Sequence, residues 1–166
     1  TAGQANFQRE GAVTTIEAAN NTSINYQQFN IGAGEMVRFI QPSANARVLN
    51  RVIGPGATQI DGSLMANGHV YIANKYGVFF GNNAIVNVGR LTAVGGSISN
   101  ADFLGGIDRF TDVQGDVANY GAIDAAAVSL IGRRVANYGA VVAHDGMVTM
   151  VAGEEVYLKD NEKPLM

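Results

Sequence analysis

The chain of 166 residues contains no cysteine. This absence excludes disulfide bonds, thiolate metal sites and cysteine nucleophiles. It is consistent with export by a route that does not tolerate covalent cross-links. Proline is also rare, with 3 residues, whereas glycine is frequent, with 21. The chain therefore has many positions for tight turns and few that break strands.

Charge is scarce as well: 15% of the residues are charged, and the formal net charge is −3. No stripe of basic residues is present, so the sequence gives no electrostatic support for nucleic-acid binding. No apolar run approaches the roughly 20 residues of a membrane-spanning helix. The chain begins with polar residues and shows no signal peptide, which fits either a cytosolic protein or a mature exported one. We expect the second.

A six-residue word occurs twice in the chain. Residues 117–122 and 135–140 both read Val-Ala-Asn-Tyr-Gly-Ala, 18 positions apart. Residues 128–131 are echoed by residues 148–151 at an offset of 20. A period near 20 indicates stacked structural repeats, each burying its apolar face against its neighbours. The segments are rich in Val, Ile, Thr and Tyr and are separated by Gly, Asn and Asp, which predicts strands and turns rather than helical repeats.

Many short strands at regular spacing predict an all-β fold, and the in-register repeat favours a solenoid over a sandwich or a barrel. At about 20 residues per coil the chain is expected to form on the order of eight coils, with no helix. Equivalent residues of successive coils then lie one above another. We expect an amide ladder between Asn119 and Asn137 and a stack of Tyr120 on Tyr138, and holding the coil shape is enough to explain all four residues.

Several ordered words along the chain resemble one known family. The first is residues 24–43, from Ile-Asn-Tyr through Gln-Pro-Ser, and Leu49-Asn50-Arg51-Val52 follows. Further words lie at residues 59–64, 66–72, 74–81, 86–93, 100–105 and 109–110. Over residues 12–155 the chain is similar to the filamentous haemagglutinin secretion domain, the amino-terminal region of exoproteins exported by two-partner secretion.

The resemblance implies a right-handed parallel β-helix with short extra-helical strands near the N-terminus. It also implies a non-enzymatic domain that the periplasmic domains of an outer-membrane transporter recognise. The chain would be threaded out unfolded, fold at the bacterial surface, and seed the folding of a longer β-helical adhesin. Residues 1–166 are accordingly expected to form a single secretion domain, the amino-terminal part of a longer exoprotein that is secreted or held at the cell surface after transit through the periplasm.

The resemblance also implies candidate secretion-motif residues. Asn74 and Gly77 match the family's Asn-Pro-Asn-Gly box, whereas Lys75 and Tyr76 replace its Pro and second Asn. The full set of candidates is Asn74, Gly77, Asn50 and Arg51. From the residues alone, Asn74 and Gly77 fit a tight corner, because Asn side chains bond turn backbone and Gly accepts positive φ. Direct contact with the transporter remains the alternative. The family usually has more residues before the position of Phe7, so either the N-terminal cap is reduced here or the sequence is shortened at this end.

The sequence offers little support for catalysis, metal binding or a cofactor. His69 and His144 follow or occupy expected turns and have no metal-site spacing. A group of acidic residues with one arginine invites comparison with β-helical polysaccharide lyases, but it lacks an Asp-x-Asp pair and is expected to form a solvated loop: Asp102, Asp108, Asp112, Asp116 and Arg109. Four aromatic residues either stack on glycans or, by strand alternation, partly fill the core: Tyr71, Tyr76, Phe79 and Phe80.

Two other functions stay open from the sequence. A solenoid with exposed end edges can stack end to end, so copies of the chain can form an extracellular filament. A polysaccharide-acting β-helical enzyme is the third possibility. Host glycans or receptors are further candidate partners, and nucleic acid is not expected.

Overall fold

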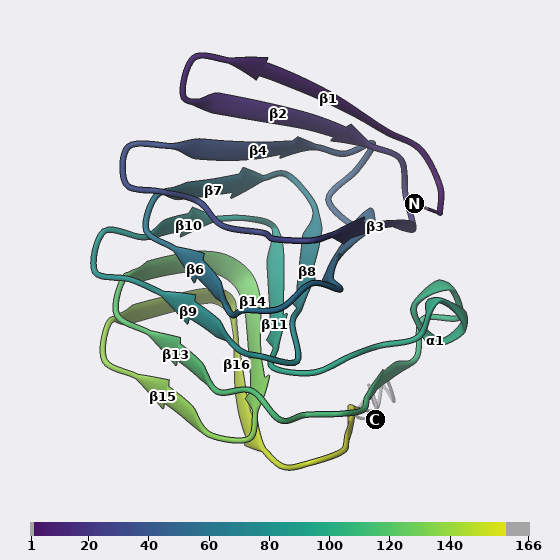
Figure 1. The fold of residues 1–166 in the computed structure, drawn as a ribbon, viewed down its shortest axis with the longest axis vertical. Coiled ribbons are helices and arrows are strands. Elements are labelled where there is room, and N and C mark those ends of the chain that lie inside the picture. The colour runs from purple at the N-terminus through teal and green to yellow at the C-terminus, as the bar shows by residue number, and fades with distance from the viewer. Residues whose placement is uncertain (1, 159–166) are drawn as a thin grey trace.

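The chain winds as a parallel β-solenoid of about six coils, in which each coil passes through three faces (Figure 1). The computed structural model describes residues 2–158. The first ladder contains β2 (Val13–Ala18), β4 (Met36–Ile40), β7 (Ser63–Ala66), β10 (Ile85–Asn87) and the first parts of β14 (Ala122–Gly132) and β16 (Ala140–Ala152).

The second and third ladders complete each coil. The second contains β3 (Thr22–Tyr26), β5 (Arg47–Val52), β8 (His69–Ala73), β11 (Arg90–Val94) and the second parts of β14 and β16. The third begins with a bridge at Ile31 and continues through β6 (Thr58–Ile60), β9 (Val78–Phe80), β13 (Val117–Asn119) and β15 (Val135–Asn137). The in-register solenoid that the repeat predicts is thus confirmed.

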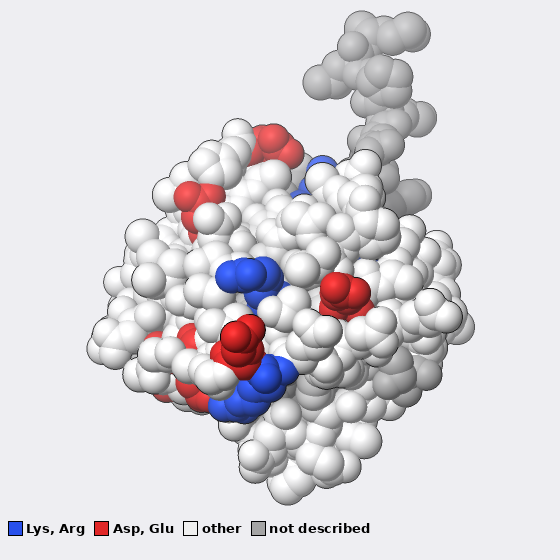
Figure 2. All heavy atoms as spheres, turned by 90° about the horizontal axis from the view of Figure 1, so that it is seen from above, with Lys and Arg blue, Asp and Glu red and all other residues white. Residues whose placement is uncertain are grey.

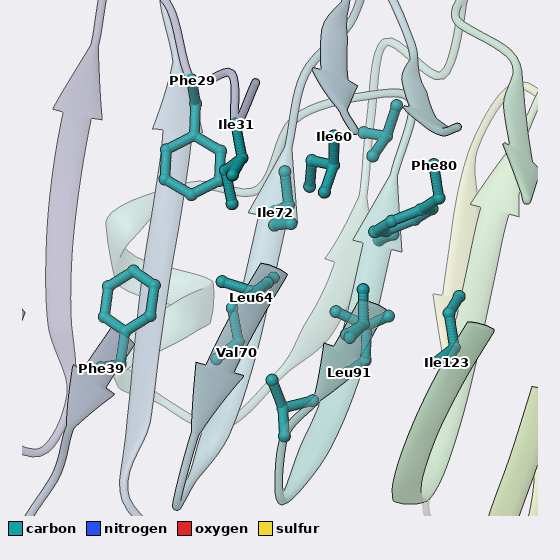
Figure 3. Packing of buried hydrophobic residues seen from close by; sticks show 14 of the residues in the cluster. Phe29, Ile31, Phe39, Ile60, Leu64, Val70, Ile72, Phe80, Leu91 and Ile123 are labelled. Atoms are coloured by element: carbon teal, nitrogen blue, oxygen red, sulfur yellow. The ribbon is translucent and has the colours of Figure 1, made fainter. Parts of the chain in front are cut away.

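The core lies inside the coils because side chains alternate between the two sides of each strand. Inward-facing residues of the three ladders point toward one another, as Phe39, Leu64, Ile72 and Phe80 do in Figure 3. Along the third ladder, Ile60 pairs with Phe80 and Phe80 with Asn119, so equivalent residues form columns. Each coil therefore buries its apolar side chains mainly against the coils above and below it.

The N-terminal end of the stack is covered by an antiparallel hairpin. β1 (Ala5–Glu10) folds back on β2, with Phe7 opposite Ile16. This strand outside the coils agrees with the expected extra-helical strands near the N-terminus. Seen from this end in Figure 2, charged side chains are few and both signs are interspersed.

The C-terminal end of the stack is open. Val148 and Met150 of β16 are 42% and 50% exposed, whereas their register partners Val128 and Leu130 in β14 are fully buried. Within residues 2–158 no strand pairs with the outer edge of β16. The last coil therefore presents core-facing apolar side chains and unpaired backbone to its surroundings.

A long excursion leaves the solenoid between β11 and β13. It contains α1 (Asn100–Leu104), capped by the Ser99 side chain, and β12 (Asp108–Phe110), which pairs antiparallel with β17 (Val156–Leu158). Its apolar residues and Val156 of β17 cover the outer side of the second ladder and form a second buried cluster. The cluster contains Ile98, Phe103, Phe110, Val113 and Val156, packed on Leu49, Tyr71, Ala73, Val94 and Ile131.

The excursion corrects two predictions. The expected solvated loop holds for Arg109 and Asp112, which are exposed, but the segment as a whole is not a solvated loop, because it contains α1 and β12 and buries Phe103 and Phe110. The expectation of no helix is wrong for the five residues of α1. No helix in the described part of the chain has the length and apolar character needed to cross a membrane.

The expected eight coils are also too many. The two copies of the word that set the period begin in coils four and five, where Val117 pairs with Val135. Earlier coils are longer, as the register partners Met36 and Ser63 show. The N-terminal hairpin and the excursion use further residues that do not extend the stack.

We predict that Phe80→Ala lowers the free energy of unfolding by about 3–5 kcal/mol, because it opens a cavity between coils. Phe7→Ala, a matched change at a residue 53% exposed, is expected to cost less than about 0.5 kcal/mol. Urea unfolding of both variants measures the difference. Equal costs would contradict a core confined to the inside of the coils.

Candidate functional site

The box of residues 74–77 forms a corner of the third coil, between β8 and β9. The turn closes with a hydrogen bond from the Gly77 N–H to the Asn74 carbonyl at 3.0 Å. The Asn74 side-chain oxygen accepts from the Tyr76 N–H at 2.9 Å. These contacts are those of an Asx-type turn, in which the side chain replaces a backbone partner.

Asn74 also joins the third coil to the second. Its side chain is buried, and its Nδ2 donates to the Gly56 carbonyl and to Thr58 Oγ1, both at 3.0 Å. Thr58 is itself fully buried at the start of β6. Every polar group of the Asn74 side chain is therefore used within the fold, and none faces outward.

Gly77 meets two constraints at once. Its φ is +118°, which L side chains rarely adopt. A Cβ at this position would lie 2.8 Å from the Asp116 carbonyl oxygen and 2.9 Å from the Phe79 ring. Lys75 and Tyr76, the two residues that depart from the family box, are instead exposed at the tip of the corner.

Asn50 lies inside the solenoid on β5. It is fully buried, its Nδ2 donates to the Tyr71 carbonyl at 3.1 Å, and its Oδ1 accepts from the Tyr26 hydroxyl at 2.9 Å. Burial raises the pKa of Tyr26, so this hydroxyl remains a donor. The amide thus satisfies polar groups of three neighbouring coils in an otherwise apolar core.

Arg51, the next residue, faces outward and holds the excursion. Its guanidinium donates to the Ile98 carbonyl at 2.6 Å and to Asn25 Oδ1 at 3.1 Å. Burial lowers its pKa from the ordinary arginine value. The structure therefore separates Asn50 and Arg51 from the box: they support the core and the excursion respectively.

Arg47, which the sequence did not single out, completes this attachment. Its guanidinium donates to the Phe103 carbonyl and lies 4.4 Å from the centre of the Phe103 ring. Arg47 and Arg51 flank Leu49 on the outer side of β5. They bind the segment around α1 at two points, the carbonyls of residues 103 and 98 respectively. The Arg-x-Leu-x-Arg pattern predicts only that both arginines lie on the same side of the strand. It does not predict which distant segment they contact.

The repeated word forms the stack that its sequence suggests. Asn119 Nδ2 donates to Asn137 Oδ1 at 3.0 Å, and Asn119 Oδ1 accepts from the Gly121 N–H at 3.0 Å. The rings of Tyr120 and Tyr138 lie 5.1 Å apart at 18°. Asn119 is fully buried, whereas Asn137 is exposed at the open end.

The histidines lie apart from each other. His69 begins β8, stacks on Tyr71 at 4.2 Å and places Nε2 2.8 Å from Thr92 Oγ1. Desolvation, with the charges of Arg47 and Arg90, lowers the pKa of His69 to about 3. His144 is exposed and pairs with Asp124 on the neighbouring coil.

Three acidic residues of the excursion are engaged in separate contacts. Asp108 accepts from the Tyr71 hydroxyl at 2.9 Å, Asp102 lies 3.9 Å from Arg109, and Asp116 pairs with Arg134 at 2.8 Å. Desolvation and Asp108 raise the pKa of Tyr71. Within residues 2–158 no group of three or more metal-ligating side chains is arranged to hold a metal ion. The acidic residues thus do not form the carboxylate cluster of a lyase.

The four aromatic residues do not form one surface. Phe80 fills the core, as strand alternation predicts, and Tyr71 lies under the excursion, so neither ring is available for stacking on a glycan. Tyr76 and the partly buried Phe79 remain accessible beside the box.

Comparisons with known proteins agree with one another. The sequence profile described as "TPS secretion domain" matches residues 3–164. The crystal structure of the HMW1 secretion domain from Haemophilus influenzae superposes with a TM-score of 0.90 at 31% identity, covering 95% of this chain and 44% of that one.

Two curated relatives are also similar. The heme/hemopexin-binding protein of Haemophilus influenzae strain Rd is 44% identical over 92 residues, which are 55% of this chain and 10% of the relative. A second heme/hemopexin-binding protein of Haemophilus influenzae is 42% identical over 81 residues, 49% of this chain and 9% of the relative. The matched region is thus about a tenth of the length of these relatives.

We predict that Asn119→Ala lowers the free energy of unfolding by about 2–3 kcal/mol, because it leaves buried backbone groups near Gly121 without partners. The same change at Asn137, which is exposed, is expected to cost less than about 1 kcal/mol. Chemical denaturation of the two variants measures this asymmetry. Similar losses would show that the ladder acts symmetrically.

We predict that stability falls as the pH drops from 7 to 5, because the unfolded chain protonates His69 near pH 6.5 whereas the folded chain resists protonation down to about pH 3. The contribution of His69 is about 1–2 kcal/mol over this range. Urea unfolding at both pH values should show a smaller difference for His69→Gln than for the wild type. An unchanged pH dependence in His69→Gln would contradict the assignment.

Proposed function

The chain belongs to the TPS secretion domain family, and from this premise we propose that it is the amino-terminal part of a longer exoprotein whose β-helical shaft it nucleates. TPS domains direct the export of exoproteins by two-partner secretion and are non-catalytic. An outer-membrane transporter recognises them, and the exoproteins are secreted or exposed at the surface after periplasmic transit. The proposal concerns how this particular fold serves that export.

The unequal ends of the stack carry the proposal. The β1–β2 hairpin covers the first coil, whereas coil six exposes Val148, Met150 and the edge of β16. A further coil docking on this edge would bury these side chains and pair the open backbone. Because each coil needs only its neighbour, folding can then proceed from the covered end toward the open one as the chain emerges.

The covered end also bears on the filament alternative. Head-to-tail stacking needs two compatible ends, and the hairpin places an antiparallel strand where the next copy would need a parallel coil. The open end therefore fits a continuation of the same chain better than a second copy. A longer exoprotein also agrees with the short share of the curated relatives that the chain covers. We further propose that the shaft acts in adhesion and that any contact with a host receptor is made by the shaft, not by this domain.

We assign the box a structural role in this process. The Asn74 side chain forms hydrogen bonds with the second coil and with its own turn. Gly77 adopts a positive φ that other residues rarely adopt. The corner thereby fixes coil three on coil two. Asn74 and Gly77, the two residues that match the family box, are both buried. We therefore expect that loss of the corner impairs folding and, as a consequence, export.

The export itself is tested by producing the chain in a bacterial host with and without its transporter. We expect the chain in the medium or on the cell surface only when the transporter is present. Light scattering of the exported chain should show a monomer. Export without the transporter would overturn the proposed function, and long regular polymers would favour the filament.

In the same assay we predict that Asn74→Ala and Gly77→Val lower the exported, protease-resistant protein at least several-fold. Each change also lowers the free energy of unfolding of the purified chain by about 2–4 kcal/mol, since one leaves buried groups unpaired and the other strains the corner. Lys75→Ala is the matched control at the exposed tip and should change neither. Box variants that are as stable as the wild type but are not exported would show direct contact with the transporter instead.

A further inference from the structure

A hollow lies on the side of the solenoid, at the corner between the second and third ladders. Its volume is about 410 Å³, and it spans coils three to five. The lining residues come from three segments that are distant in sequence: Tyr76, Phe79, Gln114, Gly115, Asp116, Arg133 and Arg134. It is distinct from the buried side chains of the box, which face the interior.

The hollow gathers positive charge in a chain whose net charge is −3. Arg133 is exposed, as is Lys75 beside Tyr76, and neither forms an ion pair with any residue from 2 to 158. Arg134 is held by Asp116 through two contacts of 2.8 and 3.3 Å. Two arginines and one carboxylate thus line the hollow, and the ammonium group of Lys75 lies beside it, 5.4 Å from the centre of the Tyr76 ring. Positive charge is therefore in excess there.

Two aromatic rings complete the surface. Tyr76 is 48% exposed, and Phe79 is partly buried against Gly77. The backbone beneath them is held by bonds between coils: Val78 N–H to the Asp116 carbonyl at 3.0 Å, and Val117 N–H to the Arg134 carbonyl at 2.9 Å. The rings and the guanidinium groups are therefore carried by a scaffold formed before any ligand arrives.

We propose that this hollow binds an acidic saccharide, a sugar that carries a carboxylate or sulfate group. Aromatic rings offer flat apolar surface to the C–H faces of a sugar ring, and the guanidinium of Arg133 matches the two oxygens of a carboxylate or sulfate. Lys75 adds a further positive charge next to the Tyr76 ring. The volume suits a short oligosaccharide rather than a protein domain.

This binding belongs to the folded domain, because three coils must be stacked to assemble the hollow. It is independent of export and goes beyond the proposed function. Failure of the saccharide-binding test would therefore leave the proposed export function intact, and failure of the export test would leave saccharide binding intact.

The test uses the purified chain and a heparin-derived tetrasaccharide, with binding followed by isothermal titration calorimetry at low and physiological salt. We expect saturable binding that weakens as salt rises. Arg133→Gln and Tyr76→Ala should each weaken it at least tenfold, whereas Arg38→Gln, an exposed arginine on the first ladder, should not. Thermal unfolding establishes that all three variants remain folded.

Three competitors define the specificity. Neutral chitotetraose, polyglutamate and a thymidine tetranucleotide are each expected to bind at least tenfold more weakly than the acidic tetrasaccharide. Absence of binding to the tetrasaccharide, or equal losses in Arg133→Gln and Arg38→Gln, would overturn the proposal. Equal affinity for polyglutamate would reduce the hollow to an anion site, and equal affinity for the tetranucleotide would reassign it to nucleic acid; either result overturns saccharide recognition.

Discussion

Vertical register between coils is the constraint on which the rest of the structure depends. Every inward position must suit the residues directly above and below it, since they share one narrow core. The third ladder shows the result: Ile60 and Phe80 are followed in the same column by Asn119 and Asn137. The amide pair satisfies the corner backbone at the point where apolar residues end. The Asn74 contact with coil two and the three-coil hollow both require the same register.

The sequence predicted those parts of the fold that repeat. The shared word begins at the same point of coils four and five, so the pairing of these coils and the positions of Asn119 and Tyr120 followed from spacing alone. The number of coils did not follow, because the earlier coils have turns of different lengths and share no such word. Periodicity also cannot count residues that leave the stack, such as the hairpin at β1.

The candidate residues divide in the same way. The turn chemistry of Asn74 and Gly77 was visible locally, since both residue types have known backbone preferences. The different destinations of Asn50 and Arg51 were not, because adjacent strand residues face opposite sides and only the fold says which side is the core. The attachment of the excursion by Arg47 and Arg51 could not be predicted from residue types either. The arginines bind the backbone carbonyls of residues 98 and 103, which any amino acid would supply.

The pairing of β12 with β17 has a consequence for the order of events. Phe110 leaves the stack at coil four, and its partner Val156 is reached only after coil six is complete. Contacts between residues so far apart form slowly, because the intervening chain must first be ordered. We therefore expect the second buried cluster to be completed last during folding. Protection of the Phe110 and Val156 amides from hydrogen exchange marks a domain whose coils are all in place.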